Sequence, residues 1–452
     1  MKDLTAGPPT KQMLELAGML MTNMLAGKLL SIVNMFWLGQ LGPEAQAAVT
    51  LAVNPVAMMM AVAPITSVGA RVLISHAVGG KCRELACRVF NEAFGVVLFA
   101  SISIALVASC ARAEVAAWLS PDPRTAEFIS AFFGWYVLAG ALQIPLALMA
   151  AGLGGTGDVR PGSVAQMGSV ALNIVVAPVL IFGWMGVPAL GIAGAGLAAL
   201  ISVGCAVAAL SWYLLRSGTY LQLLPRLWLS RPTILWRLLA IGLPTGLQTA
   251  ASAGCMLVFT LLLRPFGPVE QAAFGIGQRM YQFALLPILA LGSAATLIAG
   301  QNFGARAFDR VYASFKTHLS LGVLIAPVLW ALAQLYARTA AAWFSDDPAV
   351  IEATAHFLRI MSYSLFPMGV LSASNAVLTA FGNTLAVLIT AAGSYLLGTI
   401  LPAWALSQLP GFNSTWLWEL TVGSVVFEMI GSLLLLRLEL NKYERSSCVA
   451  GQ

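Results

Sequence analysis

The chain has 452 residues, of which 59% are hydrophobic and only 9% are charged. Soluble domains carry charge on about a quarter of their residues. Water therefore cannot solvate this surface on all sides, and most of it must face lipid. This composition excludes a soluble enzyme. The six cysteines form no CxxC pair, so the sequence indicates neither a disulfide framework nor a zinc site, and we expect no bound metal.

Apolar runs long enough to cross a bilayer recur along the chain. A spanning helix needs about 20 mainly apolar residues, and clusters of Gly, Pro and charged residues separate the runs. We expect the first run to be a membrane anchor rather than a cleavable signal peptide, because it is full length and lacks a small-residue cleavage site. The twelve predicted spans are residues 13–39, 46–75, 91–111, 126–151, 161–183, 191–215, 238–264, 272–299, 315–337, 349–380, 385–408 and 416–437.

Lys and Arg are distributed unequally between the two sets of predicted loops. The loops on the side of both termini hold 16 of these residues, and the opposite loops hold 4. By the positive-inside rule, the protein is predicted to be a multi-pass inner-membrane protein with both termini in the cytoplasm. The net charge of +6 then reflects orientation, and we expect no nucleic-acid partner.

The second half of the sequence repeats the first without a gap, in one alignment that we call the repeat register. GPEAQAA at 42–48 matches GPVEQAA at 267–273, and AAWLSPDP at 116–123 matches AAWFSDDP at 341–348. Halves of six spans each must be parallel repeats. The sequence therefore predicts an all-α membrane protein of two six-helix lobes, residues 1–215 and 238–452, joined by a cytoplasmic linker at 216–237.

This architecture favours a carrier over a channel or an enzyme. Two similar bundles form a central cleft whose opening can alternate when one half rocks against the other. A channel is more often a symmetric oligomer with a filter motif. A membrane enzyme should show clustered ionisable residues at a span end, and the three histidines are far apart in the sequence.

Several segments, in their order and spacing, resemble the multidrug and toxic compound extrusion (MATE) family. They are FWLGQLGPEAQAAV, LISHAVGG, LGIAGAGLAALIS, GLPTGLQ, AGQNFGARAFDR and LTAFGNT. The resemblance implies a V-shaped bundle of two lobes. It also implies export of small organic compounds, often cationic drugs, in exchange for protons or sodium ions.

The acidic residues that the resemblance implies are absent from this sequence. The first-span aspartate corresponds to Asn34, and the fifth-span pattern of Asn followed four residues later by Asp corresponds to Asn173 and Ala177. The seventh-span glutamate falls at Ser252 and the tenth-span aspartate at Met368. We expect these positions to belong to the substrate or coupling site, but coupling cannot use the acids that are usual in the family.

Lys28 lies near the middle of the first span. A charge at this depth costs at least about 2.5 kcal/mol, so an ionisable residue there is by default a functional hypothesis. Asn23 and Asn34 share one helix face, and Lys28 lies roughly 120 to 140° from it. Lys28 therefore either lines the central cleft or binds backbone carbonyls or a carboxylate within its lobe.

Glu428 is the only carboxylate well inside a predicted span. A carboxyl at this depth can carry a proton. Arg359 enters the tenth span from the same outer side and reaches a similar depth, so two interpretations remain open. Glu428 is either the coupling group or the partner of Arg359 in a structural ion pair.

Other polar and aromatic side chains can line a cleft for a planar ligand. Among them we single out Gln248 and Tyr281. Because a cleft that bears Lys28 and lacks the usual acids should disfavour organic cations, we predict a monomeric MATE-like antiporter that exports a small anionic, zwitterionic or neutral organic compound, coupled to protons or sodium ions and without enzymatic activity. The alternatives are a flippase for a lipid-linked anionic substrate and a binding protein that kept the transporter fold but lost its coupling.

Overall fold

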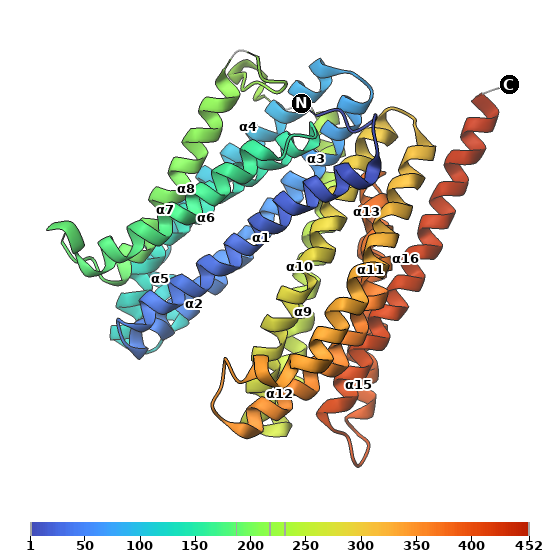
Figure 1. Ribbon diagram of the computed structural model, residues 1–452. Helices are drawn as coiled ribbons and strands as arrows, with labels where there is room; N and C mark the ends of the chain where they lie inside the picture. Colours follow the sequence, from blue (N-terminus) through green and yellow to red (C-terminus); the bar gives the residue numbers. More distant parts are fainter. Residues whose placement is uncertain (1, 187, 217, 230–231, 451–452) are drawn as a thin grey trace. The chain divides into compact units, whose positions relative to one another are not determined.

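The computed structural model describes residues 2–186, 188–216, 218–229 and 232–450, and these ranges contain helices and no strand. Figure 1 shows their arrangement. The helices of the first half of the chain are α1 (Pro9–Gly39), α2 (Pro43–Met60), α3 (Val62–Gly79), α4 (Arg83–Cys110), α5 (Arg112–Leu119), α6 (Pro123–Gly155), α7 (Arg160–Phe182), η1 (Trp184–Gly186) and α8 (Ile192–Leu215).

The second half has the same general plan with more interruptions. Its elements are η2 (Pro225–Leu227), α9 (Pro232–Leu262), η3 (Arg264–Phe266), α10 (Gly267–Gly304), α11 (Phe308–Ala341), α12 (Pro348–Met361), η4 (Ser362–Ser364), α13 (Leu365–Ala380), α14 (Thr384–Gly393), η5 (Ser394–Ile400), α15 (Leu401–Leu406) and α16 (Ser414–Ala450). The short helix α5 was not predicted from the sequence, because it is too short to form an apolar run of its own.

The prediction of an all-α membrane protein is confirmed. Ten stretches of the described chain are long and apolar enough to cross a membrane, and one of them, Pro232–Gly304, contains the two predicted spans α9 and α10. The predicted span 349–380 is divided by η4 into α12 and α13. Each of the twelve predicted spans thus corresponds to one helix or to consecutive helices.

The repeat predicted from the sequence is also visible in the backbone. Lys81 and Arg306 are equivalent in the repeat register and lie in the α3–α4 and α10–α11 loops, with φ of 59° and 57°. They are the non-glycine residues with positive φ in the described chain. Asp122 and Asp347, also equivalent, cap α6 and α12 through their side chains. The two halves therefore share a loop conformation and a helix cap at equivalent positions.

The chain divides into two compact units whose boundaries differ from the predicted lobes. The first contains residues 2–3 and 22–246, and the second contains residues 4–21 and the chain from 247 onwards. The linker packs with the first unit, although its residues 217, 230 and 231 lie outside the described ranges. The crossing points, 21/22 and 246/247, are themselves equivalent in the repeat register. Each unit thus contains the leading half of the other unit's first helix.

Buried contacts explain why residues 4–21 pack with the second unit. Leu4 and Met13 are fully buried. The Leu4 N–H donates to Gln301 Oε1 at 3.1 Å, and Asn302 Nδ2 donates to the Leu4 carbonyl at 3.1 Å. Arg310 donates from Nη2 to the Gly7 carbonyl at 2.9 Å and from Nε to Asn302 Oδ1 at 3.0 Å. The backbone of the N-terminal segment is therefore satisfied by side chains of the second half.

The first unit holds the linker and the leading half of α9 in a similar way. Asn91 Oδ1 accepts from the Leu224 N–H at 2.7 Å, and Asn91 Nδ2 donates to the Gln222 carbonyl at 2.8 Å. Helix α9 also crosses α3 closely, because a β-carbon at Gly242 would overlap the Ile65 carbonyl oxygen. Only glycine permits this approach.

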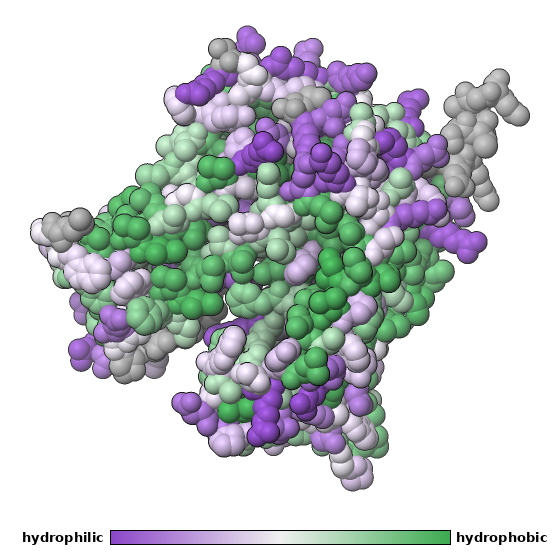
Figure 2. Space-filling view, in the orientation of Figure 1, coloured by the Kyte–Doolittle hydropathy of each residue, from purple (hydrophilic) through white to green (hydrophobic). Residues whose placement is uncertain are grey.

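The outer surfaces of both units are apolar over their middle parts. Figure 2 shows hydrophobic residues covering the middle of the helices and hydrophilic residues gathered towards their ends. Phe99 on α4 is 76% exposed and Leu335 on α11 is 73% exposed. Water would penalise such surfaces, whereas the hydrocarbon of a bilayer does not.

Candidate functional site

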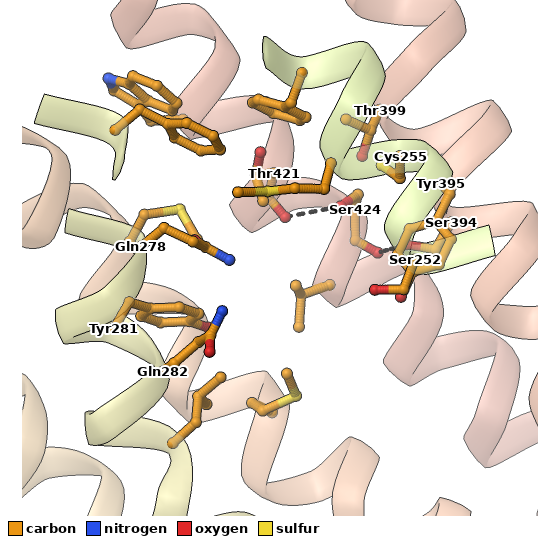
Figure 3. A pocket seen from close by; sticks show the side chains of 18 of the residues that line it. Ser252, Cys255, Gln278, Tyr281, Gln282, Ser394, Tyr395, Thr399, Thr421 and Ser424 are labelled. Carbon is orange, nitrogen blue, oxygen red and sulfur yellow. Dashed lines mark hydrogen bonds between the residues drawn. The ribbon is translucent and has the colours of Figure 1, made fainter. Parts of the chain in front are cut away.

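The second unit contains an open pocket of about 340 Å³. Figure 3 shows its polar side chains from α10 facing those from α9, η5 and α16. Its volume lies in the range of small-molecule sites. The lining residues are Ser252, Cys255, Met256, Phe259, Phe274, Gln278, Tyr281, Gln282, Leu285, Phe357, Met361, Met368, Ser394, Tyr395, Thr399, Trp418, Thr421, Ser424, Val425 and Glu428.

One wall of the pocket is a π-helical segment, η5. Pro402 follows it and has no N–H to donate to the carbonyl four residues earlier, and its ring would clash with that carbonyl. The widened turns accommodate this break and place Ser394, Tyr395 and Thr399 in the lining. Gly398 allows α16 to pack closely, because a β-carbon there would lie 2.8 Å from Ser424 Cβ. Wide turns of this kind are common at functional sites.

An aromatic cluster contributes Phe259, Phe274, Phe357 and Trp418 to the lining. The rings of Phe274 and Trp418 are stacked with centroids 5.6 Å apart, and Phe357 packs edge-on against Trp418 at 4.8 Å. These rings form a rigid apolar surface that suits the face of a planar ligand. Trp418 is buried, and its Nε1 has no partner in the described chain.

The rest of the lining is polar but mostly uncharged. Tyr281 Oη and Ser364 Oγ are 2.6 Å apart, Ser394 Oγ donates to the Ser424 carbonyl at 2.8 Å, and the Tyr395 hydroxyl is hydrogen-bonded to Ser252. Glu428 is the one acidic residue in the described lining and is 8% exposed. Its carboxylate forms neither a hydrogen bond nor an ion pair with the described residues.

The ion pair between Arg359 and Glu428 is not formed. Ion pairs of the described chain include Arg88–Glu92, Arg124–Glu44, Arg338–Glu352 and Lys442–Glu439, and neither Arg359 nor Glu428 takes part in one. Phe357 and Met361 line the pocket from one face of α12, and Arg359, two residues from each, lies on the opposite face. Similar depth in the membrane therefore did not bring the two charges together.

The first unit encloses a second pocket, of about 410 Å³, with no ionisable side chain except Tyr136 in its described lining. Asn173 is 3% exposed and its Oδ1 has no partner in the described chain, whereas Gln143 Nε2 donates to Gln166 Oε1 at 3.3 Å. The amide-bearing residues of this lining are Asn34, Gln143, Gln166 and Asn173.

The two pockets occupy equivalent places in the repeat. Most residues that line one pocket have a counterpart in the other when the halves are aligned in the repeat register. The equivalent pairs are Leu30/Cys255, Ser31/Met256, Asn34/Phe259, Val53/Gln278, Val56/Tyr281, Met60/Leu285, Tyr136/Met361, Gln143/Met368, Ser169/Ser394, Ala199/Ser424 and Val203/Glu428.

Comparison with known proteins identifies the architecture. The profile of the MatE family matches residues 20–179 and 244–404. The chain belongs to the MatE family. This MatE protein is 24% identical over 360 residues to the FAD transporter of Shewanella oneidensis, with 79% of each chain covered. It is 29% identical over 426 residues to the probable multidrug resistance protein NorM of Deinococcus radiodurans, covering 91% of this chain and 92% of that one.

Solved structures confirm the MATE fold. A transporter of the MOP superfamily from Pyrococcus furiosus matches with a TM-score of 0.89 at 21% identity, and the crystal structure of MATE in complex with MaL6 matches with 0.91 at 21% identity. Each match covers 98% of both chains. The protein is therefore a multi-pass MATE family transporter.

Six of the predicted site residues of the MatE protein line one of the two pockets. Ser252, Tyr281, Met368 and Glu428 share the pocket of the second unit, and Asn34 and Asn173 share that of the first. Lys28 on α1 and Gln248 on α9 are half-buried and line neither. The described residues contain no group of three His, Cys, Asp or Glu side chains that could hold a metal ion.

Sequence reasoning missed the contribution of η5 and of Trp418 to this site. Two signals were available. Pro402 and Gly398 in a predicted span indicate an irregular helix, and the repeat register would have aligned Ser394 with Ser169 and Glu428 with Val203. Neither signal identifies a lining residue until the two pockets are aligned position by position.

Proposed function

We propose that this MATE family protein is a proton-coupled exporter of small organic compounds and that Glu428 carries the proton. The observation that carries the proposal is a nearly buried carboxyl in a pocket of the second unit, without a cationic partner in the described chain. An isolated buried carboxylate is costly, so such a group prefers to be neutral and protonated. A group whose proton occupancy differs between two conformations can couple a proton gradient to transport.

The position of Glu428 supports this role. Ser252 and Met368, which stand where the family resemblance leads one to expect acids, line the same pocket. A single carboxyl from α16 thus supplies the acidity that those positions on α9 and α13 lack. The surrounding hydroxyls of Ser252, Tyr395 and Ser424 can stabilise either protonation state through hydrogen bonds.

The chemistry of the pockets favours anionic, zwitterionic or neutral substrates over simple cations. When Glu428 is protonated, the described linings carry no negative charge. The amides of the first pocket both donate and accept hydrogen bonds, and the aromatic cluster of the second suits a planar ring. The related FAD transporter is named for an anionic compound that carries planar rings, which agrees with this class.

Transport in proteoliposomes tests the proposal. Purified protein is assayed with FAD, norfloxacin and ethidium as anionic, zwitterionic and cationic probes, under an imposed pH gradient or sodium gradient. We expect the pH gradient to drive movement of FAD or norfloxacin, and Glu428→Gln to reduce this movement to that of protein-free vesicles. Glu419→Gln, an acid on the same helix outside this pocket, is the matched control and should behave as wild type.

Three results would contradict the proposal. They are transport driven by sodium alone, pH-driven transport that survives Glu428→Gln, and binding of the probes without any transport. The last result would identify a binding protein with the transporter fold. Movement of a fluorescent anionic lipid in place of the soluble probes would identify a flippase.

A further inference from the structure

His318 is a buried polar side chain that the proposed transport cycle does not yet use. It lies on α11 with 0% exposure, and neither Nδ1 nor Nε2 has a hydrogen-bond partner in the described chain. Buried polar atoms without a protein partner are rare, and ordered water commonly satisfies them. The two ring nitrogens of His318 are therefore available to bind water or a proton.

Polar side chains recur on the packed helices α16, α13 and α11, between Glu428 and His318. Ser432 lies one turn beyond Glu428 on the same face of α16, is fully buried and donates from Oγ to Asn375 Oδ1 at 2.7 Å. Asn375 and Ser372 are three residues apart on α13 and also share a face. The polar groups thus pass from α16 to α13.

Gly292 of α10 brings the last two members together. A β-carbon built there would lie 2.5 Å from Ser372 Oγ and 3.6 Å from His318 Cε1. Both side chains therefore converge on one point, which only a glycine leaves open. Ser314 and Arg310 continue the same face of α11 at four-residue spacing towards the start of the helix, which the Lys and Arg distribution predicts to be cytoplasmic.

The equivalent positions of the first unit are entirely apolar. The repeat register aligns the whole series with aliphatic side chains or alanine. Glu428, Ser432, Asn375, Ser372, His318 and Ser314 correspond to Val203, Val207, Ala150, Ala147, Ala93 and Val89. The first unit therefore packs without polar side chains at these positions, and the polar series distinguishes the second unit.

We infer that Ser432, Asn375, Ser372 and His318 form a hydrated proton path between Glu428 and the α10–α11 end of the second unit. This inference rests on the proposed role of Glu428. In the transfer, the Glu428 carboxyl loses its proton and becomes a carboxylate. The proton passes along water and hydroxyl groups to a ring nitrogen of His318, which becomes an imidazolium and then releases the proton to water.

The electrostatic surroundings are compatible with a transient charge on His318. Helix α13 and residues 285–299 of α10, which pack against α11, contain no ionisable residue. The charged residues of α11 are Asp309, Arg310 and Arg338 near its ends and Lys316, two residues before His318 and therefore on another face of the helix. The ionisable residues of α12 are Glu352, His356 and Arg359. No described ion pair holds His318 permanently charged, so it can act as a reversible acceptor.

Infrared spectroscopy of the whole protein separates the path from the proton site. The carbonyl stretch of a protonated carboxyl, assigned by its loss in Glu428→Gln, reports the equilibrium protonation of Glu428. The rate at which this band shifts after transfer to D₂O, or disappears after an alkaline pH jump, reports access of the proton. The variants are His318→Phe and Ser432→Ala, with His356→Phe as the control.

We expect both path variants to slow exchange and deprotonation of Glu428 about tenfold or more, with its equilibrium titration unchanged. A purely structural role would not alter the rate while preserving the titration. Ser432→Ala removes one hydroxyl and so remains informative if His318→Phe does not fold. Wild-type rates in Ser432→Ala would overturn the path, whereas absence of any titrating Glu428 band would instead overturn the proposed function.

Discussion

The two pockets share one scaffold but carry different chemistry. In the second unit the lining combines an aromatic cluster, the hydroxyls of η5 and the carboxyl of Glu428. In the first unit the equivalent of Glu428 is Val203, and the notable polar groups are the amides of Asn34 and Asn173. The difference teaches that two repeats can share backbone geometry while one pocket carries an ionisable group and the other carries neutral hydrogen-bonding groups.

The largest effect is expected when the acidic residue is moved from the second pocket to the first, which tests whether the two pockets differ in function. In a Val203→Glu, Glu428→Gln double variant, the carboxyl lies at the equivalent position of the first pocket. We expect pH-driven transport of FAD or norfloxacin to remain at the level of protein-free vesicles, because Val207, Ala150 and Ala93 offer no polar path there. Recovery of transport would mean that the two pockets are interchangeable.

The next largest effect is a loss of stability expected from a change at Gly242, where the leading half of α9 packs against α3 in the first unit. Gly242→Ala would place a β-carbon against the Ile65 carbonyl, and we expect it to destabilise the protein by about 3 kcal/mol through overpacking. Its equivalent on α1 is already Ala17. Gly18→Ala, with no atom within 4 Å of the new β-carbon, is the control. Thermal unfolding in detergent measures both, and equal melting temperatures would show that the close crossing is not needed.

Asn302 binds the backbone of the N-terminal segment and Asn91 binds that of the linker, so the two units can be compared by removing each side chain. Asn302→Ala and Asn91→Ala each leave buried backbone groups of the docked segment without a partner. We expect each change to cost about 2 kcal/mol and the costs to add in the double variant, because the two side chains share no partner. Unequal costs in the same thermal unfolding assay would indicate that one segment is held mainly by apolar contacts.

The smallest expected difference lies between the helix caps Asp122 and Asp347. Asp122 accepts hydrogen bonds from the Thr125 hydroxyl and N–H, whereas Asp347 accepts from the Ala349 N–H. The Thr125 hydroxyl, followed by its N–H, lowers the pKa of Asp122 below its usual value. Its stabilising contribution is therefore present above the unfolded-state pKa and is lost as the pH falls through the folded-state pKa.

This cap difference can be measured as the pH dependence of thermal unfolding. We expect Asp122→Asn to lower the melting temperature slightly at neutral pH and to have no effect at strongly acidic pH. Asp347→Asn should have the smaller effect at neutral pH. A larger effect of Asp347→Asn would mean that the extra hydroxyl of Thr125 adds nothing to the first cap.

The spans and the repeat could be predicted from the sequence because both depend on local patterns. Long uninterrupted apolar runs mark spans directly, and the match of AAWLSPDP with AAWFSDDP fixed the register in which Asp122 and Asp347 cap equivalent helices. Glu428 was singled out because an acid inside a span is conspicuous.

The remaining features depend on contacts between distant segments. The exchange of residues 4–21 follows from partners such as Gln301 and Asn302, which no local pattern connects with Leu4. The Arg359–Glu428 ion pair is absent because two residues at the same depth in the membrane can still lie on helix faces that do not meet. His318 lies near the start of the predicted span 315–337, but neither its burial nor its approach to Gly292 of α10 is indicated by that position.

The docking of the N-terminal segment constrains how the protein is made. The hydrogen bonds of Leu4 join residues separated by 297 and 298 positions, so residues 4–21 receive their partners only after α10 has been synthesised. Until then their apolar side chains and backbone must be protected by lipid, by chaperones or by the insertion machinery. Folding of the second half is thereby tied to a segment that was synthesised about 300 residues earlier.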